Sequence, residues 1–268
     1  MTPATSGAFT EGFVEAGGLR IQLRRGGRGA PLLVLHGELG VPGWLRAYGL
    51  LAERFDVHVP SLPGFGESAR PEWIASVRDL AAWVTWCVRD LKLAAPLPVV
   101  GFSLGGWVAA EIATMNAAIF SKMVLVGAAG LQPESGHVWD YFIHSNAEAF
   151  AQAFSEPGKA AEYAQYYGNW SSDDEARAEV NREMAARLIW KPYMRSHTLP
   201  ALLGGVVTPT LVVWGRDDRI IPLNVCQRYA RAIPGATAAI LDGCGHMPEM
   251  EQPEVFAREV LDFLASPA

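Results

Sequence analysis

Short runs of Val, Leu and Ile alternate along this chain with longer segments in which apolar residues recur every three or four positions. Such short runs are typical of buried strands, and the longer segments are typical of helices that cover a sheet. The alternation therefore predicts an α/β fold with a mostly parallel sheet and helices on both faces. The expected strands are residues 19–23, 32–35, 57–59, 98–100, 123–126, 210–213 and 238–241, and the expected covering helices are residues 44–54, 77–91, 104–116, 224–233 and 253–264.

The alternation stops between residues 131 and 200, where strand-like runs disappear. A stretch of about 70 residues is too long for a plain loop in a compact domain, so it predicts an inserted helical unit. We therefore divide the chain into a core of residues 1–130 and 201–268 and an insertion of residues 131–200. Helices are expected in the insertion near residues 138–154, 159–167 and 173–188, the last beginning after Ser171 or Ser172.

The composition and charge of the chain make some classes of protein unexpected, among them nucleic-acid-binding and membrane proteins. The chain has 268 residues, of which 50% are hydrophobic, and 28 acidic residues outnumber 22 basic ones. No long run of Lys or Arg offers a phosphate-binding stripe, so nucleic acid is not an expected partner. The cysteines are few and widely spaced, and neither a secretion signal nor an apolar span of about 18 residues is evident, which favours a cytoplasmic protein without membrane contact. We expect a small-molecule substrate and no cofactor or metal, and a homodimer is compatible with the sequence.

The segment Gly101-Phe102-Ser103-Leu104-Gly105 follows a predicted strand and precedes a predicted helix. A strand, G-x-S-x-G and a helix form the context of a nucleophile elbow, a tight turn that presents a serine hydroxyl. Glycines are needed because the turn is strained and larger side chains would collide with neighbouring elements. Ser103 would then lie at a helix N-terminus, whose free N–H groups favour the negative charge that develops in acyl transfer. In the alternative interpretation, Ser103 only caps the helix.

A serine hydroxyl becomes a strong nucleophile only when a base removes its proton, so a histidine is needed nearby. Among the six histidines, His246 has the most suitable position, in a glycine-rich loop after the last predicted strand. His36 is expected to organise a loop and His58 to lie in the core. The remaining histidines fall in or beside the insertion and are His137, His144 and His197. We therefore predict that His246 is the base.

The histidine in turn needs a carboxylate on a loop after another strand, between the serine and the histidine in the chain. Asp217 and Asp218 both follow the predicted strand 210–213, and spacing alone does not separate them. Consecutive loop side chains diverge, so only one of the two can face the histidine. The other is expected to be solvated or to pair with Arg216 or Arg219.

Acyl transfer also needs backbone N–H groups that stabilise the oxyanion. One is expected from Leu104, the residue after the nucleophile. The other is expected from Glu38, in the loop that follows an earlier strand. The carboxylate of Glu38 must then point away from the forming anion, or face it at an energetic cost.

Five motifs, taken in order, resemble the α/β-hydrolase superfamily over nearly the whole chain. They are HGELG at 36–40, PGFGES at 63–68, GFSLGG at 101–106, WGRDDRIIP at 214–222 and GCGHMPEMEQP at 243–253. The resemblance implies a mostly parallel eight-stranded sheet with a helical cap, which the insertion would form. It places the acid at Asp218 rather than Asp217, the base at His246, and the oxyanion donors at Glu38 and Leu104.

The resemblance also implies a function. Ser103 stands where haloalkane dehalogenases and epoxide hydrolases have an aspartate, and the elbow is similar to that of esterases, so a carboxylic ester, thioester or lactone is the expected substrate. The small cap also resembles that of meta-cleavage C–C hydrolases. Those enzymes commonly have an asparagine where this chain has Phe102, and a glycine-rich HGxGPG loop where it has HGELGV. A catalytically silent binding protein of the same fold is the alternative from another class.

Aromatic residues are dense in the insertion and are suited to line an apolar cleft. We therefore expect an apolar or aromatic acyl group, although about half of these side chains would only join the cap to the core. His144 and Lys191 could recognise a polar group, but a surface position is expected for each. The aromatic residues are Trp139, Tyr141, Phe142, Phe150, Phe154, Tyr163, Tyr166, Tyr167, Trp170 and Trp190.

Overall fold

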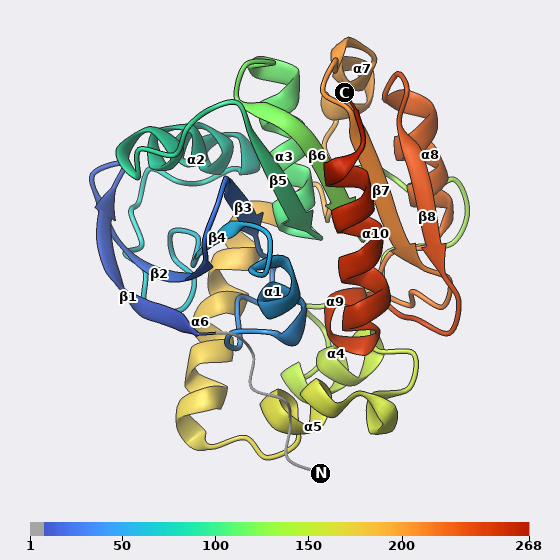
Figure 1. Cartoon of the computed structure of the whole chain (residues 1–268). Helices are drawn as coiled ribbons and strands as arrows, with labels where there is room; N and C mark the ends of the chain where they lie inside the picture. The colour runs from blue at the N-terminus through green and yellow to red at the C-terminus, as the bar shows by residue number, and fades with distance from the viewer. Residues whose placement is uncertain (1–7, 268) are drawn as a thin grey trace.

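The computed structural model describes residues 8–267, which form an eight-stranded sheet in the order β1-β2-β4-β3-β5-β6-β7-β8 (Figure 1). The strands from β4 to β8 in this order pair in parallel, whereas β2 pairs antiparallel with both β1 and β4. The predicted α/β class with a mostly parallel sheet is therefore confirmed. The strands are β1 (Phe9–Ala16), β2 (Leu19–Gly27), β3 (Pro31–Leu35), β4 (Asp56–Pro60), β5 (Leu97–Phe102), β6 (Phe120–Val126), β7 (Thr210–Gly215) and β8 (Thr237–Leu241).

Strand β1 is not among the strands that the apolar runs predict. It lies at the edge of the sheet and most of its side chains are exposed, so no apolar run marks it. Gly17 and Gly18 join it to β2, and their φ angles of +56° and +72° fit a two-residue hairpin turn. The signal for this antiparallel edge in the sequence is therefore the glycine turn and not an apolar pattern.

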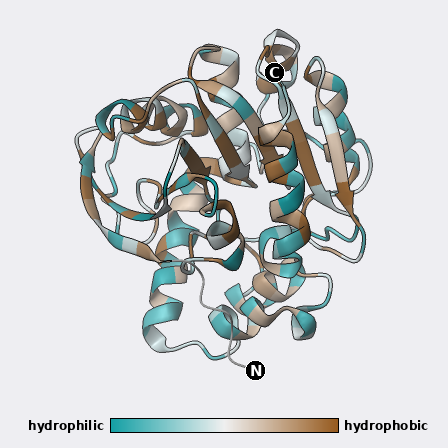
Figure 2. Cartoon of the chain, in the orientation of Figure 1, coloured by the Kyte–Doolittle hydropathy of each residue, from teal (hydrophilic) through white to brown (hydrophobic). Residues whose placement is uncertain are grey.

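Helices cover both faces of the sheet. Helix α1 (Arg46–Leu51) packs against α10 (Pro253–Ala265) in front of the sheet in Figure 1, whereas α3 (Leu104–Met115) lies behind it and packs against α2 (Val77–Asp90). Helix α8 (Asn224–Ala232) packs against β7 and β8. The central strands between these layers are buried and largely hydrophobic, as their brown colour in Figure 2 shows.

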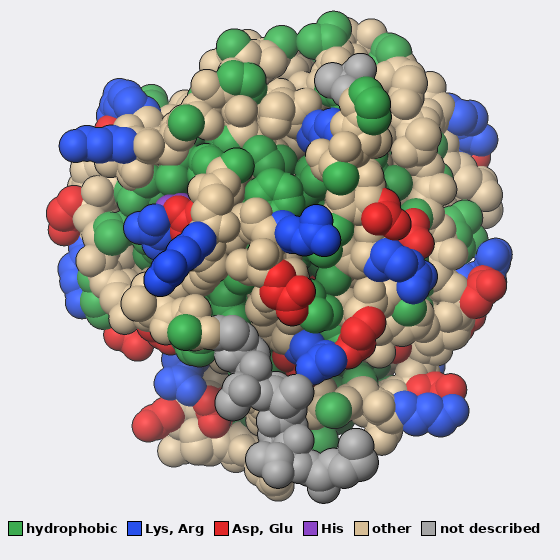
Figure 3. Space-filling model, in the orientation of Figure 1, with side chains coloured by type: hydrophobic (Ala, Val, Ile, Leu, Met, Phe, Trp, Pro, Cys, Tyr) green, Lys and Arg blue, Asp and Glu red, His purple; other side chains and the backbone are tan. Residues whose placement is uncertain are grey.

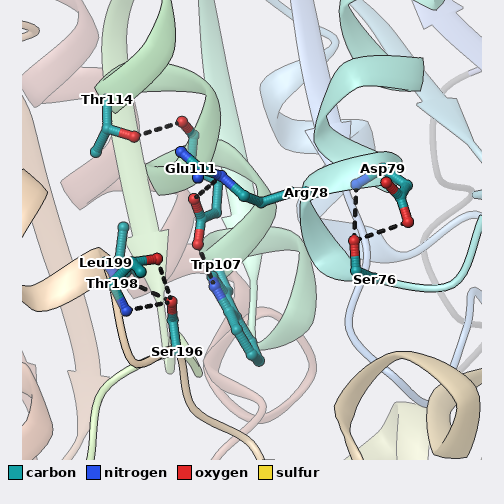
Figure 4. A network of polar contacts seen from close by, with 9 residues as sticks. All are labelled: Ser76, Arg78, Asp79, Trp107, Glu111, Thr114, Ser196, Thr198 and Leu199. Atoms are coloured by element: carbon teal, nitrogen blue, oxygen red, sulfur yellow. Dashed lines mark hydrogen bonds and ion pairs between the residues drawn. The ribbon is translucent and has the colours of Figure 1, made fainter.

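A buried carboxylate fixes helix α3 to helix α2. Oε1 of Glu111 accepts a hydrogen bond from the indole of Trp107 at 3.1 Å, and Oε2 lies 3.3 Å from Nε of Arg78 (Figure 4). Because Glu111 is only 1% exposed, its charge depends on these two partners for stabilisation. The contact holds in place the helix that begins directly after Ser103.

Residues 131–200 contribute no strand to the sheet; α4, α5 and much of α6 lie in the lower part of Figure 1, whereas α7 lies at the top. The helix expected over residues 138–154 begins only at Asn146, because Ser145 and Glu148 form a capping box that starts it there. The long helix expected to begin after Ser171 or Ser172 is capped by Ser171. The helices are α4 (Asn146–Ala153), α5 (Ala161–Tyr167) and α6 (Ser172–Ile189), and α7 (Leu199–Leu202) leads back to the sheet.

The surface is of mixed charge. Figure 3 shows Lys and Arg side chains interspersed with Asp and Glu over the visible face, without a large patch of one sign. Within residues 8–267, no helix has both the length and the apolar character needed to cross a membrane.

Candidate active site

Ser103 occupies the tight turn between β5 and α3. Its φ and ψ angles are +43° and −109°, a conformation that residues with a side chain rarely adopt. The backbone around it is closely packed, since a Cβ atom added to Gly105 would lie 2.1 Å from the carbonyl oxygen of Leu35. A Cβ atom added to Gly101 would lie 2.5 Å from the carbonyl oxygen of Gly105. Glycine at both positions therefore allows α3 to approach the strands that carry the serine.

His246 and Asp218 meet at the end of the sheet where β7 and β8 terminate. Nδ1 of His246 lies 2.8 Å from Oδ2 of Asp218. The other carboxylate oxygen, Oδ1, accepts hydrogen bonds from the amides of Ile220 and Ile221 at 2.8 and 2.9 Å. The side chains of His246 and Asp218 are 5% and 0% exposed. The structure thus brings together the histidine and the aspartate that the motifs single out.

Asp217 points the other way. It is exposed, and its Oδ2 accepts a hydrogen bond from the hydroxyl of Ser155 at 3.2 Å. Neither expected ion pair forms, because Arg216 instead pairs with Asp242 and Arg219 donates to the carbonyl groups of residues 154 and 155. The solvated position is therefore the correct alternative for Asp217, and pairing with either arginine was wrong.

Ser103 and His246 line one cavity, which we name the carboxylate cavity because Glu38 and Glu249 also line it. The space between its side chains is about 430 Å³, including the part that is open to solvent. The hydroxyl of Ser103 and Nε2 of His246 are buried, and neither has a hydrogen-bond partner within residues 8–267. Both atoms are therefore available to a reactant in the cavity. The lining residues are His36, Gly37, Glu38, Leu39, Gly40, Pro42, Leu45, Tyr48, Phe102, Ser103, His246, Met247 and Glu249.

His36 organises the loop that passes beside Ser103. Its Nδ1 donates to the carbonyl of Gly37 at 2.7 Å, and its Nε2 accepts from the amide of Leu62 at 2.9 Å. Burial lowers the pKa of His36 to about 4, so the imidazole is neutral. The loop lies very close to the nucleophile, since a Cβ atom added to Gly37 would lie 3.2 Å from Cβ of Ser103.

The two expected oxyanion donors, Glu38 and Leu104, belong to this loop and to the first turn of α3. Within the described chain, neither backbone N–H donates to another protein group, so both can bond to a ligand oxygen. The carboxylate of Glu38 does not point to solvent. Its side chain is 3% exposed and lines the carboxylate cavity, and Oε2 has no hydrogen-bond partner among residues 8–267. The carboxylate of Glu38 is therefore buried beside the two expected oxyanion donors rather than solvated.

The family of the chain is shown by sequence comparison. The model of the alpha/beta hydrolase family matches residues 32–259, a range that includes all the residues of this site. The chain belongs to the alpha/beta hydrolase family. It is therefore an enzyme of the hydrolase class, as are its named relatives.

The relatives of this hydrolase are named for different substrates. The chain is 26% identical over 271 residues to the 2-hydroxy-6-oxo-6-(2'-aminophenyl)hexa-2,4-dienoic acid hydrolase of Metapseudomonas resinovorans, covering 96% of this chain and 92% of that protein. It is 28% identical over 260 residues to the pimeloyl-[acyl-carrier protein] methyl ester esterase of Vibrio vulnificus, covering 88% and 95%. The solved meta-cleavage product hydrolase of Pseudomonas fluorescens IP01 superposes with a TM-score of 0.76 at 22% identity, covering 94% and 97%.

In this hydrolase, negative charge surrounds His246. Burial by itself lowers the pKa of the imidazole, but the carboxylate of Asp218, followed by those of Glu38 and Glu249, raises it to about 9. Burial also raises the pKa of Glu249 to about 8. The carboxylate cavity therefore favours positive charge, both on His246 and on any group bound next to it.

Among the residues of the carboxylate cavity that sequence reasoning missed, Glu249 and Tyr48 are the ones with polar groups. Glu249 lies in α9 (Pro248–Glu251), three residues after His246, and is 4% exposed. Its signal in the sequence was an acidic residue inside the conspicuous GCGHMPEMEQP motif. Tyr48 lies on α1 and is buried against Trp44, and nothing in its sequence context marked it as part of a site.

A second cavity adjoins the first, and we name it the aromatic cavity because Trp139, Tyr141 and Tyr193 line it. Glu38 and His246 line both cavities. Among the aromatic residues expected to line an apolar cleft, Trp139 and Tyr141 are therefore beside the site. Tyr193, which was not among them, lies there too.

Two polar residues of the insertion, His144 and Lys191, lie at the surface. His144 is partly exposed and stacks on Trp139 with ring centroids 4.4 Å apart, and Lys191 is exposed. Neither lines the carboxylate cavity or the aromatic cavity. Over residues 8–267, the His, Cys, Asp and Glu side chains form no cluster that could hold a metal ion.

Proposed function

We propose that this chain is a serine hydrolase that cleaves a small apolar or aromatic ester-like substrate, with Ser103 as nucleophile, His246 as base and Asp218 as the acid that orients the base. One observation carries the proposal. The unpaired hydroxyl of Ser103, held at a strained elbow, and the unpaired Nε2 of His246 line one cavity, and Asp218 holds the opposite nitrogen of the same imidazole. These are the parts that activate a serine for acyl transfer.

The mechanism follows from these positions. His246 takes the proton of the Ser103 hydroxyl as its oxygen attacks the substrate carbonyl carbon, and the resulting oxyanion accepts hydrogen bonds from the amides of Glu38 and Leu104. The intermediate then collapses, and His246 passes the proton to the leaving alcohol. Water repeats the sequence on the acyl-enzyme and releases the carboxylic acid.

A second candidate function is hydrolysis of a C–C bond in a meta-cleavage product, and the names of relatives in Metapseudomonas resinovorans and Pseudomonas fluorescens favour it. Two features of this chain favour the ester. Phe102 lines the cavity beside the nucleophile, where an asparagine is common in those enzymes. A dienoic acid would also bring its own carboxylate to a cavity that already holds Glu38 and Glu249.

The test is turnover of matched substrates by the wild type and Ser103→Ala. We expect the wild type to hydrolyse p-nitrophenyl hexanoate, and Ser103→Ala to lose about 10⁴-fold or more of kcat while remaining folded by circular dichroism. Ser172→Ala, which removes an exposed hydroxyl in the insertion, is the control and should retain turnover. Retained ester hydrolysis in Ser103→Ala would refute the assignment of the nucleophile. Faster cleavage of a vinylogous 1,5-diketone than of esters and lactones would favour the C–C hydrolase.

A fluorophosphonate probe separates an enzyme from a catalytically silent protein of the same fold. The probe needs an activated serine, so we expect it to label the wild type and not Ser103→Ala. A wild type that is folded but does not react would indicate a binding protein instead.

A further inference from the structure

Two carboxylates line the cavity that holds Ser103, and no lysine or arginine lines it. Glu38 and Glu249 are 3% and 4% exposed, so water contributes little to their solvation. Oε2 of each is buried and has no hydrogen-bond partner within residues 8–267. They come from different parts of the chain, one from the loop after β3 and the other from α9, so the cavity is built with acidic groups on two sides.

Unpaired buried carboxylates destabilise a protein unless they gain a proton or a partner. The environment of Glu249 does favour its protonated form, because burial raises its pKa to about 8. A bound ammonium group also offsets the free-energy cost of burying an unpaired carboxylate, because it supplies both a positive charge and several hydrogen-bond donors. Arg182 lies 5.2 Å from the ring centroid of Tyr141 and donates hydrogen bonds to the carbonyls of Phe142 and His144 at 2.7 Å each, so its donors are not directed at the carboxylates.

Aromatic side chains line the same two cavities as the carboxylates. Tyr48 and Phe102 line the carboxylate cavity. Trp139, Tyr141 and Tyr193 line the aromatic cavity, where Glu38 is their acidic neighbour. The faces of Trp, Tyr and Phe attract cations through their quadrupole, most strongly where water is excluded. A carboxylate beside several aromatic rings can bind an ammonium group on an apolar chain, because the carboxylate accepts its hydrogen bonds and the rings contact both the cation and the chain.

We propose that this hydrolase acts on substrates that carry an ammonium group on their apolar part, and that Glu38 and Glu249 bind that group while Ser103 attacks the carbonyl. This substrate class rests on the proposed serine hydrolase function. It explains how a carboxylate can be kept beside an oxyanion site, because the bound cation neutralises its repulsion of the developing anion. It also predicts that substrates with a carboxylate in the same place are rejected.

Binding is tested without turnover, on the folded Ser103→Ala protein, by isothermal titration with three ligands of equal chain length. We expect n-hexylammonium to bind at least about tenfold more tightly than n-hexanol, as a charge-assisted hydrogen bond allows, and n-hexanoate to bind most weakly. Equal affinity for hexylammonium and hexanol, or tighter binding of hexanoate, would overturn the proposal. This comparison needs no change to either glutamate, so it does not depend on the folding of a glutamate variant.

Variants of the glutamates then locate the ammonium site. In the Ser103→Ala background, Glu38→Gln and Glu249→Gln should each weaken hexylammonium by about tenfold and leave hexanol nearly unchanged. Glu162→Gln is the matched control. Glu162 is also buried, but it accepts a hydrogen bond from the Arg46 amide at 2.8 Å, which glutamine can still accept, and it lines neither cavity. An equal loss in Glu162→Gln would show a general charge effect and contradict an ammonium site at Glu38 and Glu249.

Turnover distinguishes failure of this proposal from failure of the proposed function. We expect the kcat/KM of the wild type to be highest for the p-nitrophenyl ester of 6-aminohexanoate, lower for that of hexanoate, and lowest for the mono-p-nitrophenyl ester of adipate. Equal rates for the first two would refute the ammonium preference and leave the serine hydrolase intact. Absence of Ser103-dependent hydrolysis of all three would refute the serine hydrolase, and the titrations would still decide whether the cavity binds ammonium.

Discussion

Nδ1 of His246 lies 2.8 Å from Oδ2 of Asp218, whose side chain is fully buried. The carboxylate cannot easily rotate, because its Oδ1 accepts hydrogen bonds from two consecutive backbone amides, those of Ile220 and Ile221. A neutral His246 therefore carries its proton on Nδ1, where Asp218 accepts it. This leaves Nε2 without a proton and able to take one from Ser103.

This relationship predicts unequal roles for the two adjacent aspartates. Asp218→Asn should lower kcat for p-nitrophenyl hexanoate by about 10³-fold to 10⁴-fold, because an amide can hold the imidazole in the wrong tautomer. Asp217→Asn should retain most of the activity, since Asp217 is exposed and, within residues 8–267, its carboxylate accepts a hydrogen bond only from the Ser155 hydroxyl. Steady-state kinetics on the two variants make the comparison. Similar losses in both, or a larger loss in Asp217→Asn, would contradict the assignment.

The strained backbone of Ser103 predicts a gain in stability when the side chain is removed entirely. At a φ of +43° and a ψ of −109°, glycine avoids a penalty that both serine and alanine incur. Ser103→Gly should therefore be more stable than Ser103→Ala by about 1 kcal/mol, although both lack the hydroxyl. Urea unfolding of the two variants measures the difference. If alanine were the more stable of the two, the strain would not be present in the folded protein.

The sequence predicts the features of the site that depend on local backbone conformation, because those conformations require particular residue types. The elbow needs Gly101 and Gly105 where no Cβ atom fits, and this requirement leaves a recognisable motif. His246 and Asp218 follow strands whose apolar runs place them at one end of the sheet. Choosing Asp218 over Asp217 needed the resemblance to a family, because the direction of a loop side chain is not encoded in its neighbours.

The carboxylates show what the sequence could not predict. Acidic residues are ordinarily solvated, and the side chains of Glu38 and Glu249 are buried only because distant elements meet over them. Helix α9, which carries Glu249, packs against both α1 and α5, which lie far from it in the chain. Edge strand β1 was missed for the opposite reason, since pairing with β2 rather than burial defines it. Tertiary packing decides each of these features.

Burial of Glu249 predicts that the folded protein loses stability as the pH rises. Its pKa is about 8 in the folded chain, against an ordinary value of 4.5, so between these values the folded state holds a proton that the unfolded state has lost. The pKa of His246, raised from 6.5 to about 9, acts in the same direction over its own interval. Glu249→Gln should therefore reduce the fall in unfolding free energy between about pH 5 and pH 9.

Urea unfolding at several pH values tests this prediction. Glu183→Gln, which changes an exposed carboxylate paired with Arg70, should follow the wild-type profile. The same decline in Glu249→Gln as in the wild type would show that Glu249 does not hold a proton in the folded state.

The pH dependence of catalysis is predicted by the charges around His246. The imidazole must be neutral to accept the serine proton, and Asp218, Glu38 and Glu249 raise its pKa to about 9 despite burial. For the neutral substrate p-nitrophenyl hexanoate, kcat/KM should therefore rise with pH, with a midpoint near that pKa. Removing a negative charge destabilises the imidazolium, so Glu249→Gln should move the midpoint to lower pH, while Glu162→Gln should not. Rates corrected for spontaneous hydrolysis between about pH 6 and pH 10 measure both midpoints. An unchanged midpoint or an upward shift in Glu249→Gln would contradict an effect of its carboxylate on the base, because loss of a stabilising anion makes the imidazolium easier to deprotonate.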